Sequence, residues 1–283
     1  MSDATLTKRR NGLRKFQGML LFAFLFLISV TLLYVFEPFS DFWNDLFSNI
    51  AAIFPAGLCA VLASQVLLRY SPSDQPRRVW VHLSIGLWLW TIAEVIWGYY
   101  NMMIGEVSIN IADLFWVLAY GFFGYAVYIQ YQIIFHPDKR LNTIWTMLWI
   151  ATTFILMLGI AWLLVRFTDE SWGFPLLLAS FYPAADIAIG LSAIRIVWRF
   201  RGGALAYPWI GLSSFSIADT LYAFVEFSGL YAWSVSQGNF WSTTADVSYV
   251  AAYLFVALGC YAQLLLLKHG PIFTITWKDH KRT

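Results

Sequence analysis

Eight apolar stretches, each long enough to cross a bilayer, constrain this chain more than any other feature of its sequence. A helix needs about 20 apolar residues to span the hydrocarbon core, and it satisfies its own backbone hydrogen bonds, which lipid cannot do. The stretches therefore predict an all-α, polytopic membrane protein with eight transmembrane helices. They cover residues 18–36, 47–68, 79–103, 111–135, 143–165, 174–198, 205–232 and 244–268.

The composition agrees with this prediction. Charged residues make up 12% of the chain, whereas a soluble domain carries about 25%. Hydrophobic residues make up 60%, including 15 Trp, 15 Tyr and 24 Phe. This balance excludes a soluble enzyme, a nucleic-acid-binding protein and a disordered chain, and it makes the lipid bilayer the first partner. Cys59 and Cys260 stand alone in apolar runs, so neither a disulfide framework nor a metal knuckle is expected.

The basic residues predict the orientation of the chain. With the N-terminus inside, 17 of the 18 Lys and Arg residues fall on the cytoplasmic side, and Arg166 falls outside. This bias follows the positive-inside rule and predicts a plasma-membrane protein with both termini in the cytoplasm. The first apolar run is long and lacks a small-x-small cleavage site, so we expect a retained helix. The outer loops at 37–45, 101–110 and 234–244 are short and acidic or neutral.

Two segments of the chain repeat the same pattern. GLWLWTIAEVIWGYYN from Gly86 and GLSSFSIADTLYAFVE from Gly211 each place an acid eight residues after the glycine. In the helices that follow, ADLFWVLAY at 112–120 matches ADVSYVAAY at 245–253. Acids are rare inside membranes, so their shared positions favour a true repeat over chance similarity between apolar helices.

A third matched pair lies upstream, where FPAG from Phe54 corresponds to YPAA from Tyr182. The offsets of 125 to 133 residues predict two tandem four-helix halves. Because four is even, both halves have the same orientation, and a pseudo-two-fold axis runs along the membrane normal. The expected parts are a basic N-terminus at 1–17, halves at 18–140 and 141–268, and at 269–283 a cytoplasmic tail too short for a catalytic domain.

Six acidic residues lie within or at the ends of the predicted spans. A charge at the bilayer centre costs about 2.5–3.5 kcal/mol on insertion scales, so each acid needs a partner, a proton or water. No Lys or Arg lies deep in a span to neutralise them. Asp113 and Asp246 sit at helix entrances, where first-turn amides stabilise an anion, and this leaves a capping role open for both. The six are Glu94, Asp113, Asp186, Asp219, Glu226 and Asp246.

Aromatic residues share helix faces with these acids. A spacing of seven places Glu94 and Asn101 on one stripe, and Asp219 and Glu226 on another. Acids supply charge and rings supply cation–π contact, so we expect an outward-facing pocket for a cation, a proton or a small amphipathic ligand. A packed core or an interfacial belt is the alternative for the rings. The candidate binding residues are Glu94, Trp97, Asn101, Asp113, Trp116, Tyr120, Asp186, Asp219, Tyr222, Glu226, Asp246, Tyr249 and Tyr253.

Several cofactor chemistries lack their sequence signals. Lys268 lies at a cytoplasmic helix end, so no lysine within a span can hold retinal. His82, His136, His269 and His280 belong to the cytoplasmic side, which argues against a His-rich zinc hydrolase and against paired haem ligands. No G-x-S-x-G, P-loop or G-x-G-x-x-G motif occurs. We therefore expect no cofactor.

The ordered motifs AEVIWGYY, ADLFWVLAYGFFGY, FYPAADIAIGLSAIRI, IADTLYAFVEFSGLY and ADVSYVAAYLFVALG span residues 86–265. They resemble a class of polytopic sensor regions found N-terminal to bacterial diguanylate cyclases and phosphodiesterases and to some archaeal histidine kinases. The resemblance implies a membrane module that receives a signal and passes it to an output domain. Because no output domain follows in this sequence, we expect signalling through a separate partner.

A weaker resemblance is to the lysoplasmalogenase-like family of eight-helix membrane hydrolases. GLSSFSIADTLYAFVEF at 211–227 is similar to that family's segment around its second catalytic Asp, and Glu94 stands where the first would be. The resemblance implies that Glu94 and Asp219 would activate a water for attack on a vinyl-ether or similar lipid bond.

The sequence favours a membrane sensory or binding module that signals through a cytoplasmic or membrane partner. It leaves open a lysoplasmalogenase-like hydrolase, a cation- or proton-coupled carrier, and a structural subunit of a larger membrane complex. A homo-oligomer is compatible with each of these hypotheses, and no nucleic-acid partner is expected.

Overall fold

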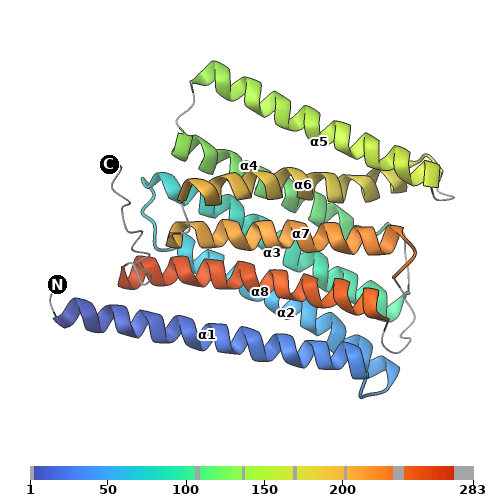
Figure 1. Cartoon of the computed structure of the whole chain (residues 1–283), viewed down its shortest axis with the longest axis horizontal. Coiled ribbons are helices and arrows are strands. Elements are labelled where there is room, and N and C mark those ends of the chain that lie inside the picture. The colour runs from blue at the N-terminus through green and yellow to red at the C-terminus, as the bar shows by residue number, and fades with distance from the viewer. Residues whose placement is uncertain are drawn as a thin grey trace, which may run out of the picture.

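The chain forms a bundle of long helices (Figure 1). The structure is a computed structural model that describes residues 3–105, 109–135, 138–167, 171–200, 203–231 and 239–270. Within these ranges all regular structure is helical, which confirms the all-α prediction. The elements are α1 (Asp3–Phe36), α2 (Asp41–Leu67), α3 (Gln75–Met103), α4 (Ile111–Phe135), α5 (Lys139–Phe167), α6 (Phe174–Phe200), the short 3₁₀ helix η1 (Ala204–Ala206), α7 (Tyr207–Phe227) and α8 (Phe240–His269).

Seven of these helices are long and apolar enough to cross a membrane, as expected of a multi-pass membrane protein. The remaining helix, α7, has 21 residues, and two of them are the acids Asp219 and Glu226. α7 packs against α6 and α8. Its crossing of the membrane stays a prediction.

Several helix ends differ from the predicted spans. α1 extends back to Asp3, α3 to Gln75 and α5 to Lys139, and three further ends lie at the loops expected outside. α2 and α8 begin at Asp41 and Phe240, so part of the expected outer loops is helical. The earlier start of α8 follows from Asn239, whose side chain accepts hydrogen bonds from the backbone amides of Trp241 and Ser242. α7 ends at Phe227 rather than at 232, because Gly229 adopts a positive φ of 65° that terminates the helix.

The packing brings four central helices together. α3 contacts α2 and α4, α7 contacts α6 and α8, and α8 also contacts α1 and α2, while α4 touches α6. Buried rings from α3, α4, α7 and α8 meet where these helices cross, at Trp90, Tyr120, Phe215 and Tyr253. α5 packs on α6 and leaves most of its apolar surface exposed, as a helix that faces lipid would.

The start of α1 and the end of α8 lie at the same end of the bundle (Figure 1). An even number of antiparallel helices requires this arrangement. The last residues of α1, α3, α5 and α7 lie at the opposite end, which we call the loop end. That the loop end faces the outside of the cell stays a prediction from the distribution of basic residues.

Candidate functional site

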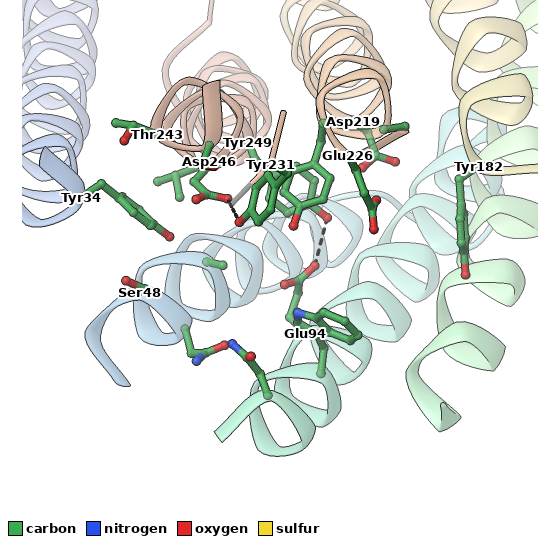
Figure 2. Close-up of a pocket in the computed structure, with 18 of the residues that line it drawn as sticks. Tyr34, Ser48, Glu94, Tyr182, Asp219, Glu226, Tyr231, Thr243, Asp246 and Tyr249 are labelled. Carbon is green, nitrogen blue, oxygen red and sulfur yellow. Dashed lines mark hydrogen bonds between the residues drawn. The ribbon is translucent and has the colours of Figure 1, made fainter. Parts of the chain in front are cut away.

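A cavity of about 1030 Å³ opens between the helices near the loop end. Every long helix except α5 contributes to its lining. Figure 2 shows Tyr34, Glu94, Tyr182 and Asp246 directed toward the same space from four different helices. Glu94 lies nine residues before the end of α3, a depth of about 14 Å, which is near the middle of a hydrocarbon core about 30 Å thick. The cavity therefore reaches from the loop end toward the membrane centre.

The cavity lining is strongly acidic. It includes seven carboxyl side chains, and its described residues include no Lys, Arg or His. In the part of the chain that the structure describes, no three His, Cys, Asp or Glu side chains converge closely enough to hold a metal ion. The charge is thus spread around a roomy space rather than focused on one point. The seven are Glu37, Asp45, Glu94, Asp113, Asp219, Glu226 and Asp246.

Glu94 is buried, with 4% exposure, and its Oε1 atom accepts from three ring donors. Tyr253 Oη donates at 2.7 Å, Tyr249 Oη at 3.0 Å and Trp90 Nε1 at 3.1 Å. The bond from Tyr249 is one of the dashed lines in Figure 2. Donors of this kind stabilise a carboxylate without a neighbouring cation, which explains how the bundle holds an acid at this depth.

Asp219 lies on the other side of the cavity and is linked to Asp186. Tyr120 Oη lies 2.7 Å from Asp219 Oδ2 and 2.8 Å from Asp186 Oδ2. Asp219 is half-buried and lines the cavity, whereas Asp186 is 1% exposed and lies behind it. A single phenol therefore connects an accessible carboxyl group to a sealed one.

Asp113 also has a tyrosine partner, and it caps a helix as well. Tyr182 Oη donates to Asp113 Oδ1 at 2.6 Å, and the backbone N–H of Asn110 donates to Asp113 Oδ2 at 2.8 Å. Asn110 Oδ1 in turn accepts from Ala112 N, which completes a capping box at the start of α4. The capping role that the sequence left open is thus present at this residue.

For Asp246 the capping role is wrong. Because α8 begins at Phe240, Asp246 lies six residues into the helix, beyond the free amides of the first turn. Its Oδ1 atom accepts from Tyr231 Oη at 2.9 Å, the second dashed bond in Figure 2. Tyr231 comes from the connection after α7 and lines the same cavity.

At the rim of the cavity, Glu37 connects α1 to α2 with a positive φ of 42°. Partial burial, with smaller contributions from Asp41 and Asp45, raises the pKa of Glu37 above its ordinary value. Glu37 and Asp45 both line the cavity, so they place two further carboxyl groups at its rim.

Aromatic rings form the floor and one wall of the cavity. Trp90 packs edge-on against Phe215 at 4.8 Å and against Tyr120 at 5.2 Å. Trp116 lies 5.9 Å from Trp97 and 6.3 Å from Trp90, between ring centroids. The Trp116 Nε1 atom is buried without a hydrogen-bond partner, which leaves an indole donor at the cavity wall.

Ten of the thirteen sequence-predicted residues line this cavity, and three lie beneath it. Those beneath are Tyr120, Asp186 and Tyr253. Tyr120 and Tyr253 are hydrogen-bonded to Asp219 and Glu94 of the cavity lining, and Asp186 is hydrogen-bonded to Tyr120. That these residues bind a ligand stays a prediction. The ten that line the cavity are Glu94, Trp97, Asn101, Asp113, Trp116, Asp219, Tyr222, Glu226, Asp246 and Tyr249.

Sequence reasoning missed five aromatic residues that line the cavity. Trp90 lies one helical turn before Glu94 and Tyr182 lies one turn before Asp186, so the spacing of each to an acid was a usable signal. Tyr34, Phe227 and Tyr231 do not lie one turn before any of the six acids of the predicted spans, and nothing in their spacing identifies them. Their place in the cavity depends on which helices pack together.

The comparisons with known proteins return no match from family models, curated proteins or solved structures. The resemblance to sensor regions and the weaker one to lysoplasmalogenase-like hydrolases therefore stay predictions.

Proposed function

We propose that the two halves of the chain are related by a pseudo-two-fold axis that passes through the ring cluster. Trp90 and Phe215 occupy matched positions 125 residues apart, and their rings are in contact. A residue that touches its own counterpart lies on or near the symmetry axis. Tyr120 and Tyr253, matched at an offset of 133, contact Trp90 and Phe215 at 5.2 and 5.3 Å.

The acid–tyrosine bonds fit the same symmetry. Glu94 of the first half accepts from Tyr253 of the second half, and Asp219 of the second half bonds Tyr120 of the first half. Each half thus supplies the phenol for the acid of the other. In this arrangement the cavity lies between the halves and forms only when both are in place.

We further propose that the protein is a membrane-embedded binding module of sensory type, whose cavity takes an organic cation and which signals through a separate partner. Seven carboxyl groups in a cavity without a basic lining residue, among those described, are the observation that carries this proposal. A volume of about 1030 Å³ is at the upper end of the range for drug-sized ligands, roughly 300–1,000 Å³. Trp97, Trp116 and Tyr182 supply ring faces for cation–π contact.

Two probes of similar size and opposite charge test this proposal. Purified protein in detergent is heated with tetraphenylphosphonium or with tetraphenylborate, and the unfolding temperature is measured. The cation is expected to raise the unfolding temperature, whereas the anion is not. The shift is expected to be lost in Glu94→Gln and Asp219→Asn. It is expected to persist in Asp138→Asn, a carboxyl group outside the cavity that accepts from the Arg140 amide. Equal shifts with both probes, or unchanged shifts in both cavity variants, would refute the proposal.

A proton-coupled carrier is the second candidate. It is favoured by the bond that Tyr120 makes to both Asp186 and Asp219, because carboxyl groups that exchange protons near the midplane are typical of carriers. Tetraphenylphosphonium crosses lipid bilayers by itself, so protein-free liposomes serve as the blank. Proton-gradient-driven uptake into proteoliposomes above this blank would support the carrier. Binding with uptake equal to the blank under any gradient would support the sensory module instead.

A further inference from the structure

Below the cavity, three groups from three helices share two short contacts. Tyr120 on α4 lies within 2.8 Å of Asp186 on α6 and of Asp219 on α7. All three lie within helices. Asp219 borders the cavity, whereas Asp186 is buried away from it. The cluster therefore extends from the cavity wall into the buried interior of the bundle.

The number of protons in this cluster follows from its geometry. A phenol has one hydrogen and can donate one hydrogen bond. If both aspartates were ionised, Tyr120 could donate to one of them, and its lone pair would then face the other carboxylate at 2.8 Å or less. One additional proton removes this conflict, because a protonated Asp donates to Tyr120 while Tyr120 donates to the other Asp. The negative charges of two carboxylates that share one phenol also repel each other, which disfavours ionisation of both.

Among the described residues around this cluster, none supplies a cation that would replace the proton. The charged and titratable groups facing Asp219 are Glu94 on α3, Tyr182 on α6 and Tyr249 on α8. On α6, Arg195 lies nine residues beyond Asp186, about 14 Å along the axis, where it stacks on aromatic rings of α4 and α5. α5 packs on α6 and carries its described charges, Arg140 and Arg166, at its two ends.

An unpartnered hydroxyl lies next to the pair on the side away from the cavity. Ser216 is 3% exposed, and its Oγ atom has no hydrogen-bond partner. Ser216 lies three residues before Asp219, and its Cβ atom is 3.0 Å from the position that a Cβ would take on Gly190. Gly190 lies four residues after Asp186, so this hydroxyl occupies the α6–α7 interface within one helical turn of both carboxyl groups.

The first half of the chain lacks this arrangement. At the offset of 128 residues that relates the FPAG and YPAA segments, the counterpart of Asp186 is Leu58. Glu94, the counterpart of Asp219, correspondingly has its three ring donors and no second carboxyl among its hydrogen-bond partners in the described chain. The two acids therefore have different partners. Glu94 accepts hydrogen bonds from three donors, whereas Asp219 shares the hydroxyl group of Tyr120 with Asp186.

We propose that Asp186, Tyr120 and Asp219 form a buried proton-binding site that holds one shared proton at neutral pH and releases it when a cation occupies the cavity beside Asp219. The release rests on the proposed function, whereas the shared proton does not. In the exchange, one positive charge enters beside Asp219, the O–H bond of the protonated carboxyl breaks, and the proton passes to water in the cavity. The net charge of the site is unchanged, which removes the cost of burying an additional charge.

Infrared spectroscopy of the full chain, without ligand at neutral pH, tests the shared proton. The difference spectrum between the wild type and Asp186→Asn is expected to contain the carbonyl stretch of a protonated carboxyl group. Asp186→Leu places the residue of the matched first-half position at this site, and its difference spectrum is expected to contain the same band. Asp113→Asn is the matched control, because Asp113 has a tyrosine donor and a backbone donor of its own, and its difference spectrum is expected to lack the band. Difference spectra of both Asp186 variants without this band would overturn the proton site.

The release is measured with tetraphenylphosphonium, which carries no titratable proton. We expect loss of the infrared band and release of about one proton per bound cation, read with a pH-indicator dye in weakly buffered solution. Binding with the band unchanged would overturn the coupling. If the probe does not bind, the proposed ligand class fails, and the ligand-free spectra still decide whether the proton site exists.

Discussion

At the scale of single residues, the acids of this bundle are held by phenols and indoles rather than by cations. Glu94, Asp113, Asp219 and Asp246 each accept from a tyrosine on another helix or connection. A tyrosine donor neutralises no charge, so the cavity keeps its negative potential while each acid keeps a partner. This combination suits a site that must attract a cation and still fold without one.

Removing one donor from Glu94 tests how much these bonds stabilise the bundle. Tyr253→Phe is expected to lower the free energy of unfolding by about 1.5–3 kcal/mol, because a buried carboxylate loses a hydrogen bond. Tyr99→Phe serves as control, since Tyr99 is 59% exposed and lies outside the cavity. Denaturant titration of both variants measures the difference. Equal stability of the two variants would show that the bond to Glu94 is dispensable.

At the scale of the elements, close helix contacts depend on glycines at matched positions. A Cβ at Gly211 would lie 2.6 Å from the Val256 Cα atom on α8, and one at Gly86 would lie 2.5 Å from the Phe123 ring on α4. Backbone cannot yield, whereas a ring can rotate. Phe123 and Val256 are 133 residues apart, so in the proposed repeat both halves place a glycine against the equivalent point of the next helix.

We expect an order of stability among three alanine variants. Gly211→Ala is expected to be the least stable, with a loss of about 2 kcal/mol or more, because α7 and α8 must separate. Gly86→Ala is expected to lose less, and Gly121→Ala to lose nothing or gain up to about 1 kcal/mol, since its Cβ meets open space on an exposed helix face. Thermal unfolding of the three proteins gives the order, and a milder effect at Gly211 than at Gly86 would contradict the close contact.

The turn between α1 and α2 carries a pH dependence whose sign is set by Glu37. Burial, with smaller contributions from Asp41 and Asp45, raises the pKa of Glu37, so its contribution to stability is present at acid pH and is lost as pH rises through that pKa. Glu37→Gln does not incur this loss. Its unfolding temperature relative to wild type is therefore expected to increase between about pH 4 and pH 7, whereas Glu37→Asp, which keeps the charge, should run parallel to wild type. If the unfolding temperature of Glu37→Gln relative to wild type instead decreased as the pH rises, the pKa of Glu37 would be lowered in the folded protein rather than raised.

Helix number, the fourth helix from 111 to 135, and the common face of Glu94 and Asn101 follow from apolar length and periodicity, so sequence alone predicts them. Pairing between helices does not follow, because spacing leaves open how each helix rotates against its neighbours. Tyr34 and Tyr231 entered the site for that reason without a sequence signal. Asp246 was misjudged because Asn239, within a polar stretch that looks like a loop, begins α8 four residues earlier than expected.

At the scale of the whole molecule, the predicted orientation places the opening of the cavity on the side away from the cytoplasm. The native cysteines Cys59 and Cys260 are both 0% exposed, so single cysteines can be added without a reactive background. Ser228→Cys, at the loop end after α7, is expected to react with a membrane-impermeant maleimide on intact cells. Ser73→Cys, between α2 and α3, is expected to react only after permeabilisation. The reverse pattern would place the cavity on the cytoplasmic side.

Equilibrium dialysis measures directly whether the acidic cavity binds an organic cation. Radiolabelled tetraphenylphosphonium is dialysed against the purified protein, with empty micelles as the blank. One saturable site per chain is predicted in the wild type and in Asp138→Asn, with no saturable binding in the Glu94→Gln, Asp219→Asn double variant. Uptake that never saturates above the micelle blank, or saturable binding that is unchanged in the double variant, would contradict the claim.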